Sequence, residues 1–361
     1  MTTSVTSAED RSRQRVLDHA AGVWTATNRY AAVLVLLIAL LITFSTTQSN
    51  FFTTANLENM LTGISILWVV SIGMTFVVLT AGIDLSVGSL LALSGIILSK
   101  LLGGVGLPAW LAVAATILIG AAIGGGVNGV LIGRFRLSFF VVTLGTLSLY
   151  SGIVNIWSQT KTVYISSSLI GSIGFGKILG LPTPIWIMAA VLVVAFVVLR
   201  WTYFGRDVYA VGGNIDAARL SGIRVARTLI AVYAISGACA ALGGVIQAGR
   251  LGAASPVVGQ DIPLSAAAAV LLGGTSFTGG VGGVVGTAVG VLFIGTLQNG
   301  LSIAGVSSFW QQIVTGIILI AAVSIDKLQQ NPGRPFVRRG DGKRRAAPAV
   351  PVEGHDPPSS S

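Results

Sequence analysis

The residues of this chain that could do chemistry are few, and they stand at the ends of apolar stretches. Amide side chains hydrogen-bond hydroxyl groups, and aromatic faces cover C–H surface, so together they are typical of a path for a small polyhydroxylated solute. Such amides more often form hydrogen bonds between helices than contacts with a ligand, and both interpretations stay open at this point. The candidates for a solute path are Asp84, Ser86, Asn128, Asp261, Gln298, Asn299, Trp310 and Gln311.

Asp84 stands where an apolar helix is expected to begin. The first N–H groups of a helix have no partner within it, and an Asp at that point accepts hydrogen bonds from residues two and three positions ahead. The sequence therefore predicts a buried helix cap at Asp84. A role in lining the solute path is the second interpretation, and the two are compatible.

The groups that enzymes and ion-coupled carriers need are missing from the apolar stretches. Both histidines, His19 and His355, lie near the ends of the chain, and no Ser/His pair, metal cluster or carboxylate pair is visible. The middle of every apolar stretch lacks ionisable residues, which argues against coupling to an ion gradient. Gly171 to Lys177 fits the start of a phosphate-binding loop, but Ile178 follows where magnesium binding requires Ser or Thr. We expect no cofactor on this chain.

The elements that carry these residues are predicted to be membrane-spanning helices. The chain has 361 residues, of which 53% are hydrophobic and 9% are charged, whereas soluble domains carry about 25% charge. A helix needs about 20 apolar residues to cross the hydrocarbon. The prediction is an all-α, polytopic membrane bundle of about ten transmembrane helices. The expected ranges are 30–47, 57–80, 83–102, 107–132, 137–158, 182–201, 228–249, 261–274, 281–300 and 309–325.

Basic residues predict the orientation of this bundle. With ten spans, 18 of the 22 Lys and Arg residues fall on one side, which the positive-inside rule assigns to the cytoplasm. This distribution explains the net charge of +10 without nucleic acid. The expected organisation is a cytoplasmic tail over 1–29, a membrane domain over 30–325 with a cytoplasmic loop at 202–227, and a basic, disordered cytoplasmic tail over 326–361.

Ten spans divide into two groups of five that would run in opposite senses. An Asp opens both the third and the eighth range, at Asp84 and Asp261, and this faint similarity is compatible with an inverted five-helix repeat or with chance. Glycines four residues apart, such as Gly120 and Gly124, allow helix backbones to approach closely in lipid. These pairs predict a tightly packed bundle and nothing more specific.

The loop at 202–227 contains the pattern of a short exposed helix. Asn214 is a good N-cap, Gly222 is a good stop, and apolar residues at helical spacing lie between and just after them. A short amphipathic helix facing the cytoplasm is typical of a segment that fits a groove on a partner. From the residues alone, a plain connecting loop remains an equal alternative.

Several segments in the same order resemble the permease subunits of bacterial ATP-binding-cassette importers for monosaccharides, the ribose/xylose type. The resemblance covers residues 50 to 326 and leaves both tails outside. The matching segments are Asn50 to Phe52, Gly82 to Leu90, Tyr209 to Ile223, Leu272 to Ser276, Gln298 to Leu301 and Gly305 to Ser308.

The resemblance implies that the loop carries a coupling helix, which docks on an ATPase subunit that uses ATP and magnesium. It also implies a homodimer in the inner membrane, with both termini cytoplasmic, supplied by an extracytoplasmic sugar-binding protein. Asp216 stands where the family often has Glu, which puts one specific ion pair in doubt. A secondary carrier or a passive channel for small polar solutes remains the alternative, and the sugar is not determined. The implied coupling residues are Gly213, Asn214, Asp216, Ala217, Ala218, Leu220, Ser221 and Gly222.

Overall fold

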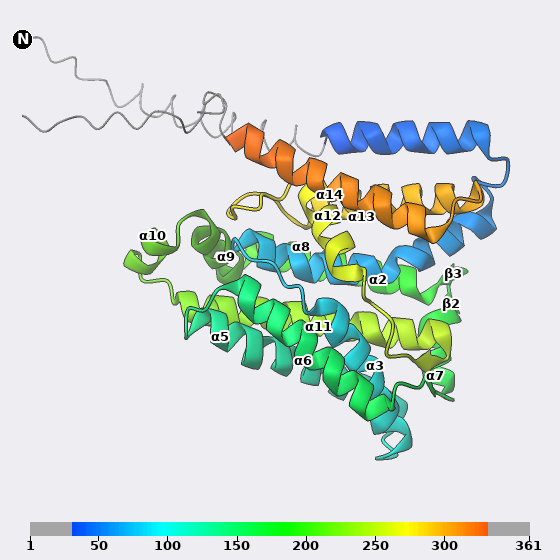
Figure 1. Ribbon diagram of the computed structural model, residues 1–361, viewed down its shortest axis with the longest axis horizontal. Coiled ribbons are helices and arrows are strands. Elements are labelled where there is room, and N and C mark those ends of the chain that lie inside the picture. Colours follow the sequence, from blue (N-terminus) through cyan, green and yellow to red (C-terminus); the bar gives the residue numbers. More distant parts are fainter. Residues whose placement is uncertain (1–30, 331–361) are drawn as a thin grey trace, which may run out of the picture.

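The computed structural model describes residues 31–330, which form a bundle of helices without a closed sheet (Figure 1). The expected tail over 1–29 and the part of the C-terminal tail beyond 330 lie outside the described residues. The last helix continues past the expected span end at 325. The long helices are Ala31–Thr47, α2 (Thr54–Leu79), α3 (Val87–Gly103), α4 (Ala109–Ile123), α6 (Phe139–Ser158), α8 (Thr183–Trp201), α11 (Val225–Leu251), α12 (Ile262–Leu272), α13 (Val284–Ile303) and α14 (Ser308–Gln330).

A helix occupies each of the ten expected ranges, but the helices differ in length. Six of them are long and apolar enough to cross a membrane. The other four apolar stretches are shorter, namely Ala31–Thr47, α3, α12 and Ser308–Ser324 within α14. The shortest, α12, has 11 residues and therefore extends only about 17 Å, against ~30 Å of hydrocarbon. Residues Ser265 to Leu271 are all buried, because α12 packs against α2, α13 and α14. The membrane location is thus supported, while the number of ten crossings stays a prediction.

Smaller elements join these helices and were not predicted. Residues Gly124–Gly129 form a π-helix between α4 and α5 (Val130–Gly133), so the expected fourth span is one continuous but irregular helical stretch. Two pairs of two-residue strands lie at the end of the bundle away from α10, and the prediction of an all-α chain missed them. The remaining elements are β1 (Val163–Tyr164), β2 (Lys177–Ile178), β3 (Leu181–Pro182), β4 (Ala253–Ala254), α7 (Ser168–Phe175), α9 (Tyr203–Gly213) and α10 (Ile215–Leu220).

Helix α11 runs through the centre of the bundle and packs on α2, α3, α4 and the π-helix. Its close approach to α4 depends on glycines. A Cβ atom added at Gly124 would collide with the backbone carbonyl of Tyr233, and one added at Gly120 would collide with Ala241. The predicted role of these four-residue glycine spacings in close packing is therefore confirmed for Gly120 and Gly124.

Candidate functional site

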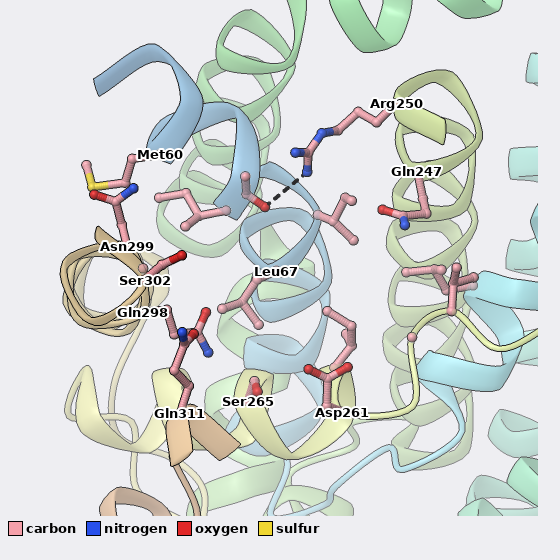
Figure 2. Close-up of a pocket in the computed structure, with 18 of the residues that line it drawn as sticks. Met60, Leu67, Gln247, Arg250, Asp261, Ser265, Gln298, Asn299, Ser302 and Gln311 are labelled. Carbon is pink, nitrogen blue, oxygen red and sulfur yellow. Dashed lines mark hydrogen bonds between the residues drawn. The ribbon is translucent and has the colours of Figure 1, made fainter. Parts of the chain in front are cut away.

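A cavity of ≈ 500 Å³ opens among α2, α11, α12, α13 and the start of α14 (Figure 2). It lies at the C-terminal end of α11, whereas α10 directly precedes the N-terminal end of that 27-residue helix. At 1.5 Å per residue the two ends of α11 are about 40 Å apart. The cavity and α10 therefore lie at opposite ends of the bundle.

Three helices each contribute a pair of polar side chains one helical turn apart. Figure 2 shows each pair projecting from one side of its helix toward the shared cavity. Residues three or four apart lie on the same face of a helix, so this spacing directs both members inward. The pairs are Gln247 and Arg250 on α11, Asp261 and Ser265 at the start of α12, and Gln298 and Ser302 on α13.

Most of these polar groups have no hydrogen-bond partner among residues 31–330. Among the residues that the structure describes, none forms a hydrogen bond with the side chains of Gln247, Gln298 or Ser265, and the Asp261 carboxylate is exposed. Asn299 differs, since it exchanges two hydrogen bonds of 3.0 Å with Asn56 on α2. Unengaged amides, a hydroxyl and a carboxylate around one cavity are able to replace the water shell of a polar solute.

Arg250 is the cationic residue of this lining, and its side chain reaches from α11 to α2. Its Nη1 donates to the carbonyl oxygen of Gly63 on α2 at 3.4 Å, the contact drawn in Figure 2. Asp261, on the other side of the cavity, makes no side-chain cap on α12. The cavity thus presents one positive and one negative group as well as neutral hydrogen-bonding groups.

The other candidates for the solute path lie elsewhere. Asp84 is fully buried, and its Oδ1 accepts from the Ser86 N–H at 3.0 Å and the Ser86 hydroxyl at 2.6 Å. Its Oδ2 accepts from the Ser236 hydroxyl at 2.9 Å, and Asn128 donates to Ser86 Oγ at 2.8 Å. None of the four lines the cavity of Figure 2. They form a buried polar cluster, here called the Asp84 cluster, that connects three separate helical segments.

Asp84 also differs from the predicted helix cap. It accepts from the residue two positions ahead, as expected, but α3 begins at Val87 with Ser86 as its N-cap, so Asp84 stands outside the helix. Asn128 reaches it from the π-helix. The carboxylate therefore stabilises the turn that leads into α3 and joins it to two other segments, and it does not cap the helix itself.

The structure brings together half of the eight candidates. Asp261, Gln298, Asn299 and Gln311 line the cavity, the Asp84 cluster is separate from it, and Trp310 lies with 61% of its surface exposed. Sequence reasoning did not select Gln247, Arg250, Ser265 or Ser302. The sequence does show these polar residues one helical turn apart near the ends of the expected spans. The spacing shows that two residues share a face of one helix, but it does not show which other helices that face meets.

At the opposite end, α10 has the boundaries that the sequence predicts. Asn214 Oδ1 accepts from the N–H groups of Asp216 and Ala217 at 3.0 and 2.9 Å, and Gly222 follows the helix with a φ of +84°. Leu220 is 90% exposed, whereas Ala218 is buried against the neighbouring helices. One face of α10 is thus anchored, and the other presents an apolar side chain to the exterior.

Helix α9 directly precedes α10 and is hydrogen-bonded to the segment that joins α12 to α13. The Tyr209 hydroxyl donates to the carbonyl oxygen of Gly282 at 2.9 Å, and Gly280 N–H donates to Leu79 at the end of α2 at 2.9 Å. Burial raises the pKa of Tyr209, so its hydroxyl stays a donor throughout the physiological pH range. These contacts connect α9, the helix next to α10, with the end of α2 and with the segment that leads into α13.

A helical membrane bundle with a polar cavity at one end and a short exposed helix at the other is the architecture expected of a multi-pass membrane permease. The chain matches the family described as "Branched-chain amino acid transport system / permease component" over residues 56–323. It therefore belongs to this permease family, and it is a multi-pass protein of the inner membrane.

Individual relatives make the family assignment more specific. The chain is 44% identical to the ribose import permease protein RbsC of Escherichia coli (strain K12) over 82% of this chain and 93% of the relative. It is 41% identical to RbsC of Bacillus subtilis (strain 168), with 81% and 90% covered. The L-arabinose ABC transporter permease protein AraH of Azospirillum brasilense is 37% identical, with 87% and 91% covered. The expected membership in the permease subunits of ATP-binding-cassette importers is confirmed, and no solved structure matches the chain.

Proposed function

We propose that this chain forms the translocation path for a monosaccharide and that the cavity of Figure 2 is where the solute binds. The observation that carries this proposal is the ring of unengaged amide, hydroxyl and carboxylate groups around ≈ 500 Å³. That volume is within the ~300–1,000 Å³ usual for small-molecule sites. Relatives that this chain matches along most of their length are named for ribose, allose and arabinose.

The physical reason is the cost of removing a sugar from water. A monosaccharide has four or five hydroxyls, and burying each without a partner costs about 2–7 kcal/mol. The resulting barrier in lipid exceeds ~10 kcal/mol. Gln247, Gln298, Ser265 and Asp261 supply donors and acceptors that replace lost water contacts, while Leu67 and Met60 cover apolar C–H surface.

The energy for transport would come from a partner ATPase bound at α10, with ATP and magnesium held by that partner. The exposed Leu220 and the anchored Ala218 support this docking role, as does the connection from α9 to α2 and α13. The proposal includes a homodimer, a sugar-binding protein at the cavity end, cytoplasmic termini, and ten spans arranged as an inverted five-helix repeat. Support for the orientation comes from basic residues that the structure describes, because Arg206 and Arg219 lie on α9 and α10 and Arg136 lines the same cavity as Asn214 and Arg219.

Pull-down of the solubilised chain from its native membrane, followed by mass spectrometry, tests the proposal. We expect an ATPase subunit and an extracytoplasmic sugar-binding protein, and ATP hydrolysis by the reconstituted complex that a loaded binding protein stimulates. Recovery of the chain alone, with uptake that survives ATP depletion and stops when the proton gradient collapses, would indicate a secondary carrier. Uptake that survives both treatments would indicate a channel.

A branched-chain amino acid is the second candidate solute. The cavity contains both Arg250 and Asp261, which have the charges needed for a carboxylate and an ammonium group, and apolar residues such as Leu67. The family description also names branched-chain amino acids. Competition experiments distinguish the two candidate solutes. If the chain transports branched-chain amino acids, unlabelled leucine would reduce the uptake of a labelled amino acid; if it transports a sugar, leucine would leave the uptake of labelled sugar unchanged.

A further inference from the structure

A second cavity lies at the α10 end of the bundle, where α8 meets α9 and α13 begins. It has a volume of ≈ 450 Å³ and is lined by Arg200, Arg206 and Tyr209 on one side and by the first turn of α13 on the other. No acidic residue is among the described residues that line it. Nothing in the translocation path or in the docking surface of α10 accounts for this cavity.

The two arginines have no acidic partner among residues 31–330. Neither Arg200 nor Arg206 forms an ion pair with any residue between 31 and 330. The Arg206 guanidinium stacks 4.2 Å from the centre of the Tyr203 ring, which fixes its position without cancelling its charge. Asp207 is the acidic neighbour on α9, but it does not line the cavity. The described lining of the cavity therefore has a net positive charge, which attracts an anion.

The start of α13 adds uncharged donors on the opposite wall. No side chain caps this 20-residue helix, and residues Gly282 to Gly286 form part of the lining. The N–H groups of a first helical turn have no acceptor within the helix and carry a partial positive charge. They supplement the arginines, which provide the main attraction for an anion.

The surroundings of the cavity show where such an anion would come from. Only 22% of the most apolar part of α8 is buried, so most of this helix lies on the outside of the bundle. Trp201 and Tyr203, which follow Arg200, are 72% and 80% exposed. Exposed Trp and Tyr next to basic residues are typical of the membrane interface. Phe196 and Val285 extend the cavity lining toward the apolar part of α8.

We propose that this cavity binds the headgroup phosphate of an anionic phospholipid from the leaflet at the α10 end. Arg200 and Arg206 bind the phosphate oxygens, and the acyl chains lie along the exposed apolar surface near Phe196. Because the lipid would contact both α9 and α13, it would also stabilise the connection through which α10 reaches the rest of the bundle. The binding itself does not depend on which solute is transported.

Native mass spectrometry of the purified chain with added lipid tests this inference. We expect phosphatidylglycerol to bind about tenfold more tightly than phosphatidylcholine, and the doubly substituted R200Q/R206Q chain to lose this preference. The control R134Q/R227Q removes the same charge from exposed arginines outside the cavity and should keep the preference. Equal lipid selectivity in R200Q/R206Q and the unsubstituted chain would overturn the proposal.

Two further measurements complete the test, a competition with phosphate and a comparison of additional variants. Inorganic phosphate is added at millimolar concentration, and displacement of the bound phosphatidylglycerol by phosphate alone would show a site for a free anion and overturn the lipid assignment. If R200Q/R206Q is not monodisperse, the single substitutions R200Q and R206Q are measured in its place, and each should weaken the preference. R200K/R206K is a further control. The Lys variant keeps both charges but loses the planar guanidinium, so we expect it to retain selectivity for the anionic lipid. Loss of selectivity in a monodisperse Lys variant would contradict the charge-based argument.

Discussion

At the scale of single residues, two aspartates that look alike in the sequence have different surroundings. Asp84 has no exposed surface and accepts hydrogen bonds from Ser86, Ser236 and Asn128. Asp261 is exposed at the mouth of the cavity, and its side chain does not cap α12. The first is therefore suited to holding helices together and the second to meeting a solute.

Replacing Asp84 with Ala should destabilise the fold. The substitution leaves buried donors on Ser86, Ser236 and Asn128 without an acceptor, and each unsatisfied buried donor costs about 1–3 kcal/mol. We expect the melting temperature of the detergent-solubilised protein to fall by several degrees. Asp261→Ala is the matched control, because it should lower solute uptake while the melting temperature stays unchanged. Equal melting temperatures for both variants would contradict this view of Asp84.

Gln298 provides the most direct test of the cavity lining. Leucine is similar in size but cannot hydrogen-bond, so Gln298→Leu leaves a solute hydroxyl unpaired, which costs about 1–3 kcal/mol. We expect the concentration for half-maximal uptake to rise about tenfold, with normal membrane insertion. Gln312→Leu is the control, since Gln312 is exposed and outside the lining. An equal effect of both substitutions would argue against the assigned solute site.

At the scale of elements, glycine position decides how closely α4 approaches α11. Gly124 and Gly126 are neighbours in the same π-helix, yet a Cβ at Gly124 collides with the backbone of α11 and a Cβ at Gly126 meets nothing within 4 Å. We expect Gly124→Val to reduce the yield of folded protein severely and Gly126→Val to leave it near normal. Size-exclusion profiles in detergent measure this difference, and similar profiles would show that the contact is dispensable.

Helix α10 gives a second prediction at this scale. Leu220 is 90% exposed, so Leu220→Asp should not disturb the fold, but it places a charge on the apolar face proposed to contact the ATPase. We expect loss of solute-stimulated ATP hydrolysis, with insertion and melting temperature unchanged. Leu220→Met keeps the apolar contact and should retain most of the stimulation. Full stimulation in Leu220→Asp would rule out this docking surface.

At the scale of the whole molecule, the two ends of the bundle have distinct chemistry. Ser221 and Tyr164 lie at opposite ends of the bundle, and both are exposed. A single cysteine introduced at either position, in a Cys239→Ala background, is therefore accessible to a thiol reagent from one side of the membrane. We expect a membrane-impermeant thiol reagent to label Tyr164→Cys in spheroplasts and Ser221→Cys only in inside-out vesicles. Labelling of both from the same side would overturn the proposed orientation.

Much of the fold was predictable because membrane-spanning segments face one constraint. Apolar stretches of about 20 residues must form helices in lipid, so α6 and α8 begin within two residues of the expected positions. The bounds of α10 followed from local chemistry at Asn214 and Gly222. Helix α9 was missed because it is short and mixed in polarity, and the paired strands were missed because two residues make no detectable pattern.

The candidate site was predictable only in part, because the sequence shows which residues are polar but not which of them lie together. Gln298, Asp261 and Gln311 were found because polar residues near span ends are unusual and noticeable. Asp84 and Asn128, 44 positions apart, met the same criterion but lie in a separate buried cluster. Arg250 was not among the candidate site residues, although it lines the cavity.

The sequence by itself determined the membrane environment, the helical class, the two ends of α10 and the kinds of polar group available. Each depends on residues close together in the chain, where helical spacing and solvent preference suffice. Only the tertiary structure decided which polar groups share the cavity and which are buried in the Asp84 cluster. Helical periodicity shows which residues share a face of one helix. The partner that this face meets depends on how closely the helices approach, and glycines such as Gly124 permit that approach only once both helices are in place.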